Sequence, residues 1–195
     1  MNVDQHLARR IHELRKAHNL TLERLSEVSG VSRSTISSIE RAEASPTAAV
    51  LNKLADALAV SMASLFSHDL RDTAESPIAR FAQQPTWTDP ESGYVRRHLS
   101  PTGFVSPLEL VEVLFPPAKV VSFDSPVRSV ATHQLIWLME GEMEVTVGDK
   151  TWRLKTGDCL AMVLDQHITF RNLTRKQARY ALAITTSPQN LGRSL

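Results

Sequence analysis

The hydrophobic residues of the first third of the chain recur with the 3.6-residue period of an α-helix. Leu7, Ile11 and Leu14 fall on one face of a first helix. A second helix is expected after Thr21, whose hydroxyl suits the N-cap position, and it must end at Gly30. The opening segment is therefore predicted to be helical.

Three further helices follow the same pattern. Ser32 can cap a third helix, in which Ile36 and Ile39 form a narrow apolar stripe. A fourth amphipathic face spans residues 51–58, and Ser61 can cap a last short helix that ends near Phe66. The pattern predicts a five-helix bundle at the N-terminus.

From Tyr94 onward the pattern changes to short apolar runs separated by turns. Turn residues stand at Glu140-Gly141, Gly148-Asp149 and Thr156-Gly157-Asp158. Many short strands at regular spacing predict a sandwich or a barrel. The expected strands are residues 108–115, 135–139, 143–147, 151–154, 159–163, 168–171 and 179–184.

The stretch between these two parts has neither period. Residues 68–93 contain three prolines and are expected to form a linker, although Trp87 indicates that part of it packs on a domain. The predicted organisation is a helical domain at 1–67, this linker, a β domain at 94–187 and a tail at 188–195.

Composition narrows the class of protein. The 195 residues are 42% hydrophobic with only 7 glycines, which suits a packed globular chain. No run of about eighteen apolar residues occurs, and the N-terminus lacks the apolar centre of a signal peptide. A single cysteine, Cys159, excludes an internal disulfide. We therefore expect a cytoplasmic protein with no membrane partner.

Charge gives little indication of a polyanionic partner. The formal net charge is +1 for the chain, and residues 1–67 hold eight basic and seven acidic residues. Binding to nucleic acid would therefore need two copies of the domain or a few well-placed cations.

Residues 4–66 carry an ordered series of motifs: Gly30-Val31-Ser32, then Ser34 through Arg41, then Pro46 and residues 51–58. This series resembles the lambda-repressor-like, xenobiotic-response-element type of helix-turn-helix domain. The family usually has glycine where this chain has Ala42, at the turn after the third helix. The resemblance also implies an ion pair between Arg15 and Glu40.

The resemblance implies that the third helix enters the major groove of double-stranded DNA. Arg33 is the candidate for a bidentate contact with guanine, while Ser34 and Ser38 can contact base edges. Hydroxyls at helix N-termini suit phosphate oxygens. The expected DNA-binding residues are Thr21, Ser32, Arg33, Ser34, Thr35, Ser37, Ser38 and Arg41.

The C-terminal part resembles a small-barrel cupin. The matching pieces are residues 138–148, 154–159 and 170–172. The fold class expected is thus multidomain α + β, with a lambda-repressor-like bundle followed by a cupin barrel of jelly-roll type. This combination resembles bacterial transcription regulators in which the barrel senses a small molecule and dimerises.

The metal-binding pattern of cupin enzymes fails in this chain. The glutamate position holds Gln134, the paired-histidine window 127–130 has no histidine, and the last ligand position holds Ile168. His133 and His167 are each one residue away, on the opposite strand face unless a bulge returns them. We therefore expect no metal, no cofactor and no enzyme activity.

Strand 134–139 is apolar on both faces beyond Gln134, so one face should line the barrel and the other a partner surface such as a second subunit. Several cations could reach the barrel mouth, among them Arg96, Arg97 and His98, and would favour a small anion such as an amino acid or organic acid. The candidate ligand-binding residues are Arg128, His133, Gln134 and His167.

These observations favour a homodimeric, ligand-responsive transcription regulator that binds an operator in the major groove. A metal-dependent cupin oxygenase or isomerase with a DNA-binding appendage is the alternative. A third possibility is a DNA-binding module whose barrel only dimerises.

Overall fold

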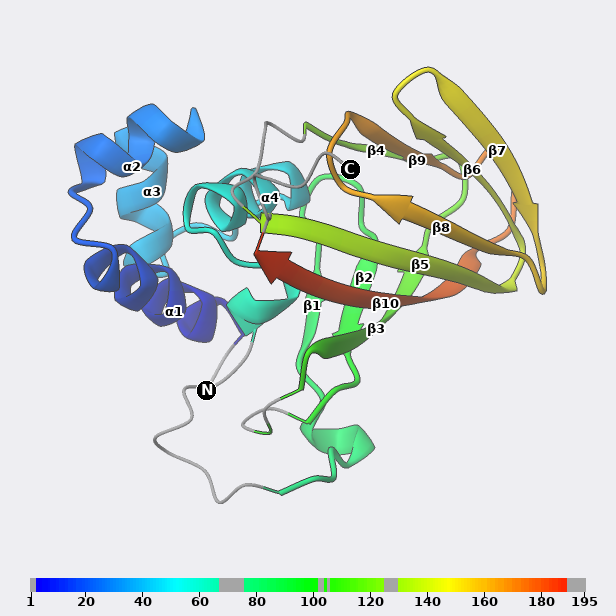
Figure 1. The fold of residues 1–195 in the computed structure, drawn as a ribbon, viewed down its shortest axis with the longest axis horizontal. Coiled ribbons are helices and arrows are strands. Elements are labelled where there is room, and N and C mark those ends of the chain that lie inside the picture. The colour runs from blue at the N-terminus through cyan, green and yellow to red at the C-terminus, as the bar shows by residue number, and fades with distance from the viewer. Residues whose placement is uncertain (1–2, 67–75, 102–103, 105, 125–129, 189–195) are drawn as a thin grey trace, which may run out of the picture.

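The computed structural model describes residues 3–66, 76–101, 104, 106–124 and 130–188. Within these residues the N-terminal domain has four α-helices (Figure 1): α1 (Val3–Ala17), α2 (Leu22–Ser29), α3 (Arg33–Glu40) and α4 (Ala48–Ala57). The prediction of a fifth α-helix is wrong. Ser61 accepts the amide of Ser64, and Ala63–Phe66 form only one 3-10 turn, η1.

Side-chain caps begin the helices where the sequence predicts them. Thr21 Oγ1 accepts the Arg24 amide at 3.0 Å, and Ser32 Oγ accepts the Thr35 amide at 3.1 Å. Gly30 ends α2 with a left-handed φ of 66°. Local sequence therefore fixes both boundaries of the turn between α2 and α3.

A buried ion pair holds α3 against α1. Arg15 donates from Nε to Glu40 Oε1 at 2.6 Å and from its terminal nitrogen to Glu40 Oε2 at 2.7 Å. Burial alone would raise the pKa of Glu40, but the hydrogen bonds from Arg15 and His12 outweigh it and lower that pKa. The pair expected from the family resemblance is present, and it orients α3.

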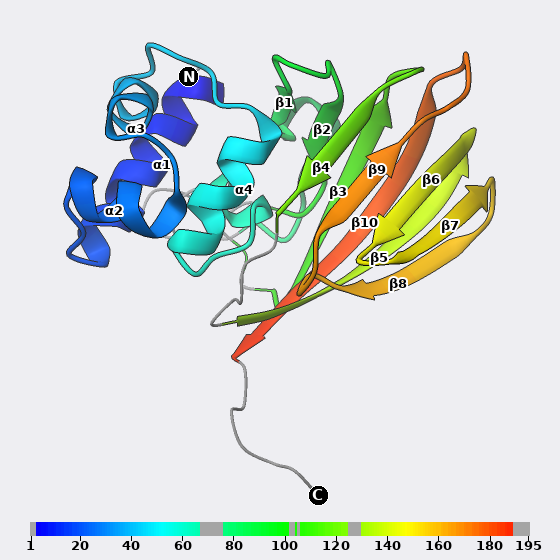
Figure 2. The same cartoon turned by 90° about the horizontal axis from the view of Figure 1, so that it is seen from above.

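The C-terminal domain consists of two antiparallel sheets (Figure 2). The six-stranded sheet has the order β1-β2-β3-β10-β5-β8, and the four-stranded sheet the order β4-β9-β6-β7. Strand bounds are β1 (Thr86–Thr88), β2 (Val95–His98), β3 (Leu108–Phe115), β4 (Val120–Phe123), β5 (Val130–Glu140), β6 (Glu142–Val147), β7 (Lys150–Lys155), β8 (Cys159–Val163), β9 (Ile168–Arg171) and β10 (Ala178–Pro188).

The sheets do not close into the barrel that the sequence predicts. The chain changes sheet at Gly141, between β5 and β6, without pairing the two layers there. Gly141 has a φ of 88°, and a Cβ at this position would lie 3.0 Å from the Gln177 carbonyl oxygen. The result is a two-layered arrangement of facing sheets.

Part of the expected linker belongs to the six-stranded sheet. A short 3-10 turn, η2 (Phe81–Gln83), precedes β1, and β1 pairs with β2. Trp87 of β1 is 1% exposed and packs edge-on against Tyr94. Strand β1 therefore covers the side of the sheet domain that faces the helices.

The helical domain docks directly on the sheets. Asp89, just after β1, accepts the Ala48 amide at the start of α4 at 2.8 Å, where a carboxylate also favours the helix dipole. Phe66 of η1 stacks on His98 with the ring centroids 4.3 Å apart. Helix α4 also contacts β4. These contacts fix the orientation of α4 and η1 on the β domain.

Ala42 adopts the left-handed conformation that the family usually assigns to glycine. Its φ is 55°, its amide bonds the Ile39 carbonyl, and the Glu43 amide bonds the Ser38 carbonyl. This closes α3 in a Schellman-type turn. The left-handed backbone costs an alanine on the order of 1–2 kcal/mol.

We predict that Ala42→Gly stabilises the protein by about 1 kcal/mol, because it removes this backbone strain. Ala49→Gly, at a helical position of α4, is the control and should destabilise by roughly 0.5–1 kcal/mol. Urea unfolding measures both. A lower midpoint for Ala42→Gly would contradict the assignment of strain at this turn.

Candidate nucleic-acid interface and ligand cavity

The N-terminal half of α3 lies on the surface of the helical domain. Ser32, Arg33, Ser34 and Thr35 are exposed, whereas Ile36 is fully buried. Of the other expected DNA-binding residues, Thr21 and Arg41 are exposed and Ser37 and Ser38 are half-buried. The structure thus leaves most of these side chains accessible, and hydrogen bonds join Ser32 to Ser34 and Thr35 and join Arg41 to Ser37.

Hydroxyl groups at the start of α3 form a connected cluster. Ser32 Oγ lies 3.0 Å from Ser34 Oγ and 2.7 Å from Thr35 Oγ1. Arg33 stands beside this cluster and forms no hydrogen bond or ion pair with any residue that the structure describes. Its guanidinium is therefore available for an external acceptor.

Arg41 differs from Arg33 because it already has partners. It donates to Ser37 Oγ at 2.7 Å and to both carboxylate oxygens of Glu43 at 2.7 and 2.8 Å. The hydrogen bonds that Arg41 donates to the Glu43 carboxylate raise the pKa of Arg41, which stays charged. A phosphate contact by Arg41 would compete with Glu43 for the charge of the guanidinium.

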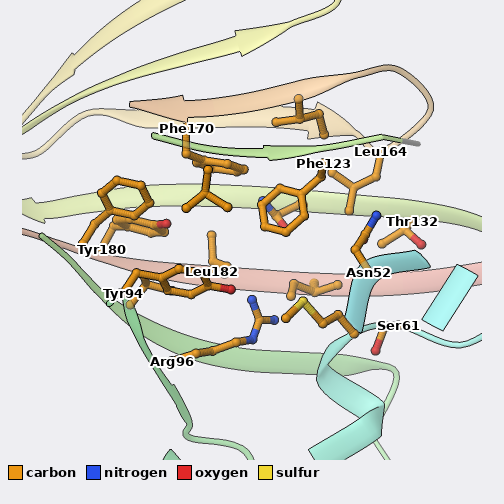
Figure 3. A pocket seen from close by; sticks show the side chains of 17 residues that line it. Asn52, Ser61, Tyr94, Arg96, Phe123, Thr132, Leu164, Phe170, Tyr180 and Leu182 are labelled. Carbon is orange, nitrogen blue, oxygen red and sulfur yellow. The ribbon is translucent and has the colours of Figure 1, made fainter. Parts of the chain in front are cut away.

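A cavity of about 60 Å³ lies between the two sheets, at the end that faces the helical domain (Figure 3). This volume is the space open to the centre of a water molecule, and one water needs roughly 10–15 Å³ of it. The cavity therefore suits a ligand of a few non-hydrogen atoms. Most of its lining is apolar and aromatic, including Phe115, Phe123, Phe170 and Leu182.

The cavity contains a buried cation. Arg96 of β2 is 6% exposed, its Nε has no hydrogen-bond partner among the described residues, and its side chain points into the cavity (Figure 3). Tyr94 is 3% exposed, and its hydroxyl likewise has no hydrogen-bond partner among the described residues. Burial raises the pKa of Tyr94 to about 12, so this hydroxyl keeps its proton at neutral pH.

The expected ligand-binding residues do not come together. Gln134 is buried and lines the cavity. His133 is exposed on the outer side of the same sheet, opposite Thr185 and Val163. His167 is exposed and bonds Asp124 at 2.9 Å. Arg128 lies outside the described residues. The bulge in β10 falls at Arg179/Tyr180 and leaves His133 facing outward.

Sequence reasoning grouped Arg96 with other cations and missed Tyr94, Asn52, Ser61 and Met62 as lining residues. The alternation of Tyr94 and Arg96 on one face of an extended segment was the available signal. The other three belong to the helical domain, and their position depends on how the two domains dock.

The cavity lining does not fit a metal ion. It contains no histidine, cysteine or carboxylate. A buried guanidinium would also repel a cation. In the part of the chain that the structure describes, no three such side chains converge anywhere.

Part of the outer face of the six-stranded sheet is apolar. Five large apolar side chains on this sheet are 36–53% exposed: Leu108 and Leu110 of β3, Leu135 and Trp137 of β5, and Val163 of β8. Strand β10 lies between β3 and β5, and β5 pairs with β8. We call these five side chains the outer apolar face. Exposed apolar patches of this kind mark protein contacts more often than solvent-facing surface.

Comparisons with known proteins give a family match for the helical domain and a fold match for nearly the whole chain. Residues 11–65 match the HTH_3 family, described as Helix-turn-helix. The crystal structure of an HTH_3 family transcriptional regulator from Vibrio cholerae matches with a TM-score of 0.74 at 23% identity, over 96% of this chain and 98% of that chain. No curated protein sequence matches the chain.

Two further solved structures are more distant. The cupin_2 domain of an XRE family transcriptional regulator from Enterobacter cloacae matches 49% of this chain and 98% of its own, with a TM-score of 0.42 and 16% identity. The hydroxypropylphosphonic acid epoxidase from S. wedmorenis matches 94% and 98%, with a TM-score of 0.45 and 18% identity. Neither likeness is close enough to support an argument about this chain.

Among the helices of the described residues, none has the length and apolar character of a membrane span.

Three observations support the same assignment for the helical domain: the capped α2–turn–α3 unit, the Arg15–Glu40 pair and the family match. The N-terminal part of this chain is a lambda-repressor-like helix-turn-helix domain of the HTH_3 family, and the whole chain shares the fold of an HTH_3 family transcriptional regulator.

Proposed function

We propose that this protein is a cytoplasmic transcription regulator that binds operator DNA through α3 and a small organic anion through its β domain. The observation that carries the first part is the accessible, hydroxyl-rich start of α3 within a helix-turn-helix domain. Side chains at that position meet base edges in the major groove.

Arg33 is the residue that we assign to base recognition. It is exposed and unpaired among the described residues, so a bidentate contact with guanine would cost no internal ion pair. The hydroxyls of Ser34, Ser37 and Ser38 contact base edges or water. Phosphates are held by Thr21, Ser32 and Thr35. Arg41 also holds a phosphate, in competition with Glu43.

The active form is a homodimer joined through the outer apolar face. A helical domain with nearly balanced charge gains little from phosphate attraction, so one copy binds DNA weakly. Two copies can place their α3 helices about 34–36 Å apart, one turn of the duplex. A second copy of the same apolar sheet face is the self-complementary partner that two-fold symmetry requires.

The effector is a small carboxylate with an apolar remainder, either an organic acid or an amino acid. Arg96 offers a buried charge that forms no ion pair with any described residue, and Tyr94 offers a hydroxyl donor beside it. A carboxylate accepts both, and charge-assisted bonds to arginine are strong. Gln134 and Thr132 add polar groups to an otherwise apolar wall. The alternative, a metal-dependent cupin enzyme, would need metal-ligating groups that this lining does not contain.

We predict that Arg33→Ala weakens discrimination between the preferred operator and guanine-substituted variants by about 1–3 kcal/mol, because one bidentate base contact is lost. Operators would first be selected from a randomised duplex library with the wild-type protein, and competition binding would follow. Arg153→Ala removes the same charge from β7, on the other domain, and should leave discrimination intact. Unchanged discrimination in Arg33→Ala would refute the assignment.

We predict that Arg96→Met abolishes binding of acetate, propionate, isobutyrate and alanine, measured by thermal shift and calorimetry. Wild-type protein should be stabilised by about 2.7 kcal/mol at 100 times the dissociation constant. The variant without ligand should melt higher than wild type, because a buried unpaired charge is removed. Arg97 pairs with Glu112 instead of entering the cavity, so the control variant Arg97→Met should still bind these carboxylates. Anion binding that survives in Arg96→Met would reject the site.

We predict that Trp137→Lys converts the dimer to a monomer, because a charge within the outer apolar face must be desolvated on association. Sedimentation velocity gives the mass of each form. Trp152→Lys, on β7 of the other sheet, is the control and should remain dimeric. A wild-type monomer at micromolar concentration would count against the dimer.

A further inference from the structure

The cavity has walls from both domains. Asn52 of α4 and Ser61 and Met62, just before η1, line it together with the strands. In Figure 3, Asn52 and Ser61 lie at the end of the cavity opposite Tyr180, on the ribbon of the helical domain. The DNA-binding domain therefore closes one end of the space that contains Arg96.

Direct bonds hold this wall in place. Asn52 Nδ2 donates to the Asp124 carbonyl, just after β4, at 3.0 Å. Ser61 Oγ donates to Glu109 of β3 at 2.5 Å. Burial raises the pKa of Glu109, while the Ser61 hydrogen bond and the charge of Arg96 oppose that rise. Ser61, Glu109 and Arg96 thus connect the helical domain electrostatically to the buried cation.

We propose that the effector site is shared between the domains. A carboxylate bound to Arg96 and Tyr94 places its apolar remainder against Met62, and the edge of the ligand lies beside Asn52. This inference rests on the proposed function of the cavity. It adds that the DNA-binding domain itself contributes to effector affinity and size selectivity.

Such a site couples ligand occupancy to the helix-turn-helix unit without an intermediate element. A ligand that touches both walls binds the docked arrangement better than any arrangement in which α4 has moved away. By linkage, it stabilises docking by the same factor. Helix α4 packs on α2, and α2 packs on α3, so the docked position of α4 sets where α3 is presented.

Hydrogen exchange on the full chain tests the shared site. Propionate should slow exchange of amides in α4 and residues 61–66 as well as in β2. Protection confined to the β domain, with propionate bound in an Arg96-dependent manner, would overturn the shared site and leave the proposed function intact. Failure of wild-type protein to bind any of the four carboxylates would overturn both.

Met62→Ala provides an independent test by size selectivity. Removing this side chain enlarges the cavity from the helical side, so the affinity for isobutyrate relative to propionate should rise roughly fourfold, the value of one buried methylene. Met143→Ala truncates a buried methionine of β6 that does not line the cavity. Its selectivity should match wild type. Equal selectivity in wild type and Met62→Ala, or equal changes in both variants, would overturn the proposal.

Discussion

The burial of Phe66 between the two domains is the contact on which the rest of the arrangement depends. This side chain is fully buried, stacks on His98 and lies 6.0 Å from the Trp87 ring, centroid to centroid. Burial lowers the pKa of His98 well below its usual value, so the stacked ring is uncharged. An aromatic cluster of this size supplies much of the apolar burial that holds η1 and α4 on the sheets. It therefore also closes the cavity.

Arg96 gives that closed space its chemical character. The Arg96 guanidinium is costly for the folded protein, because its hydration is lost in an aromatic cavity and it forms no ion pair with any described residue; Glu109 senses its charge without pairing with it. Such a group is kept where it meets an external partner, and a small carboxylate supplies both the missing charge and the missing acceptor. The same reasoning argues against a metal ion. The cost of the buried cation and the preference for an anion thus have one cause.

Local patterns predicted those parts of the fold that short-range physics controls. The caps Thr21 and Ser32, the stop at Gly30 and the strand from Leu108 to Phe115 lie where propensity and periodicity placed them. The prediction of a fifth α-helix was wrong, because a cap at Ser61 begins a 3-10 turn as readily as an α-helix. Strand β4 was missed, since its identity depends on pairing with β9, which is distant in sequence. Strand β1 was missed because its three residues are too few to show an alternating pattern.

The sequence by itself determined the helix-turn-helix unit, because its caps, its turn and its exposed Arg33 lie within one short segment. It also determined that Gln134, Ile136 and Leu138 share one face of β5 and Leu135 and Trp137 the other, because strand alternation has a fixed period. The packing of the two sheets decided which of these faces points inward. Only the tertiary structure decided that the sheets stay separate, and that Arg96 rather than His133 or His167 enters the cavity. The walls at Asn52 and Met62 depend on domain docking, a long-range contact that no local pattern encodes.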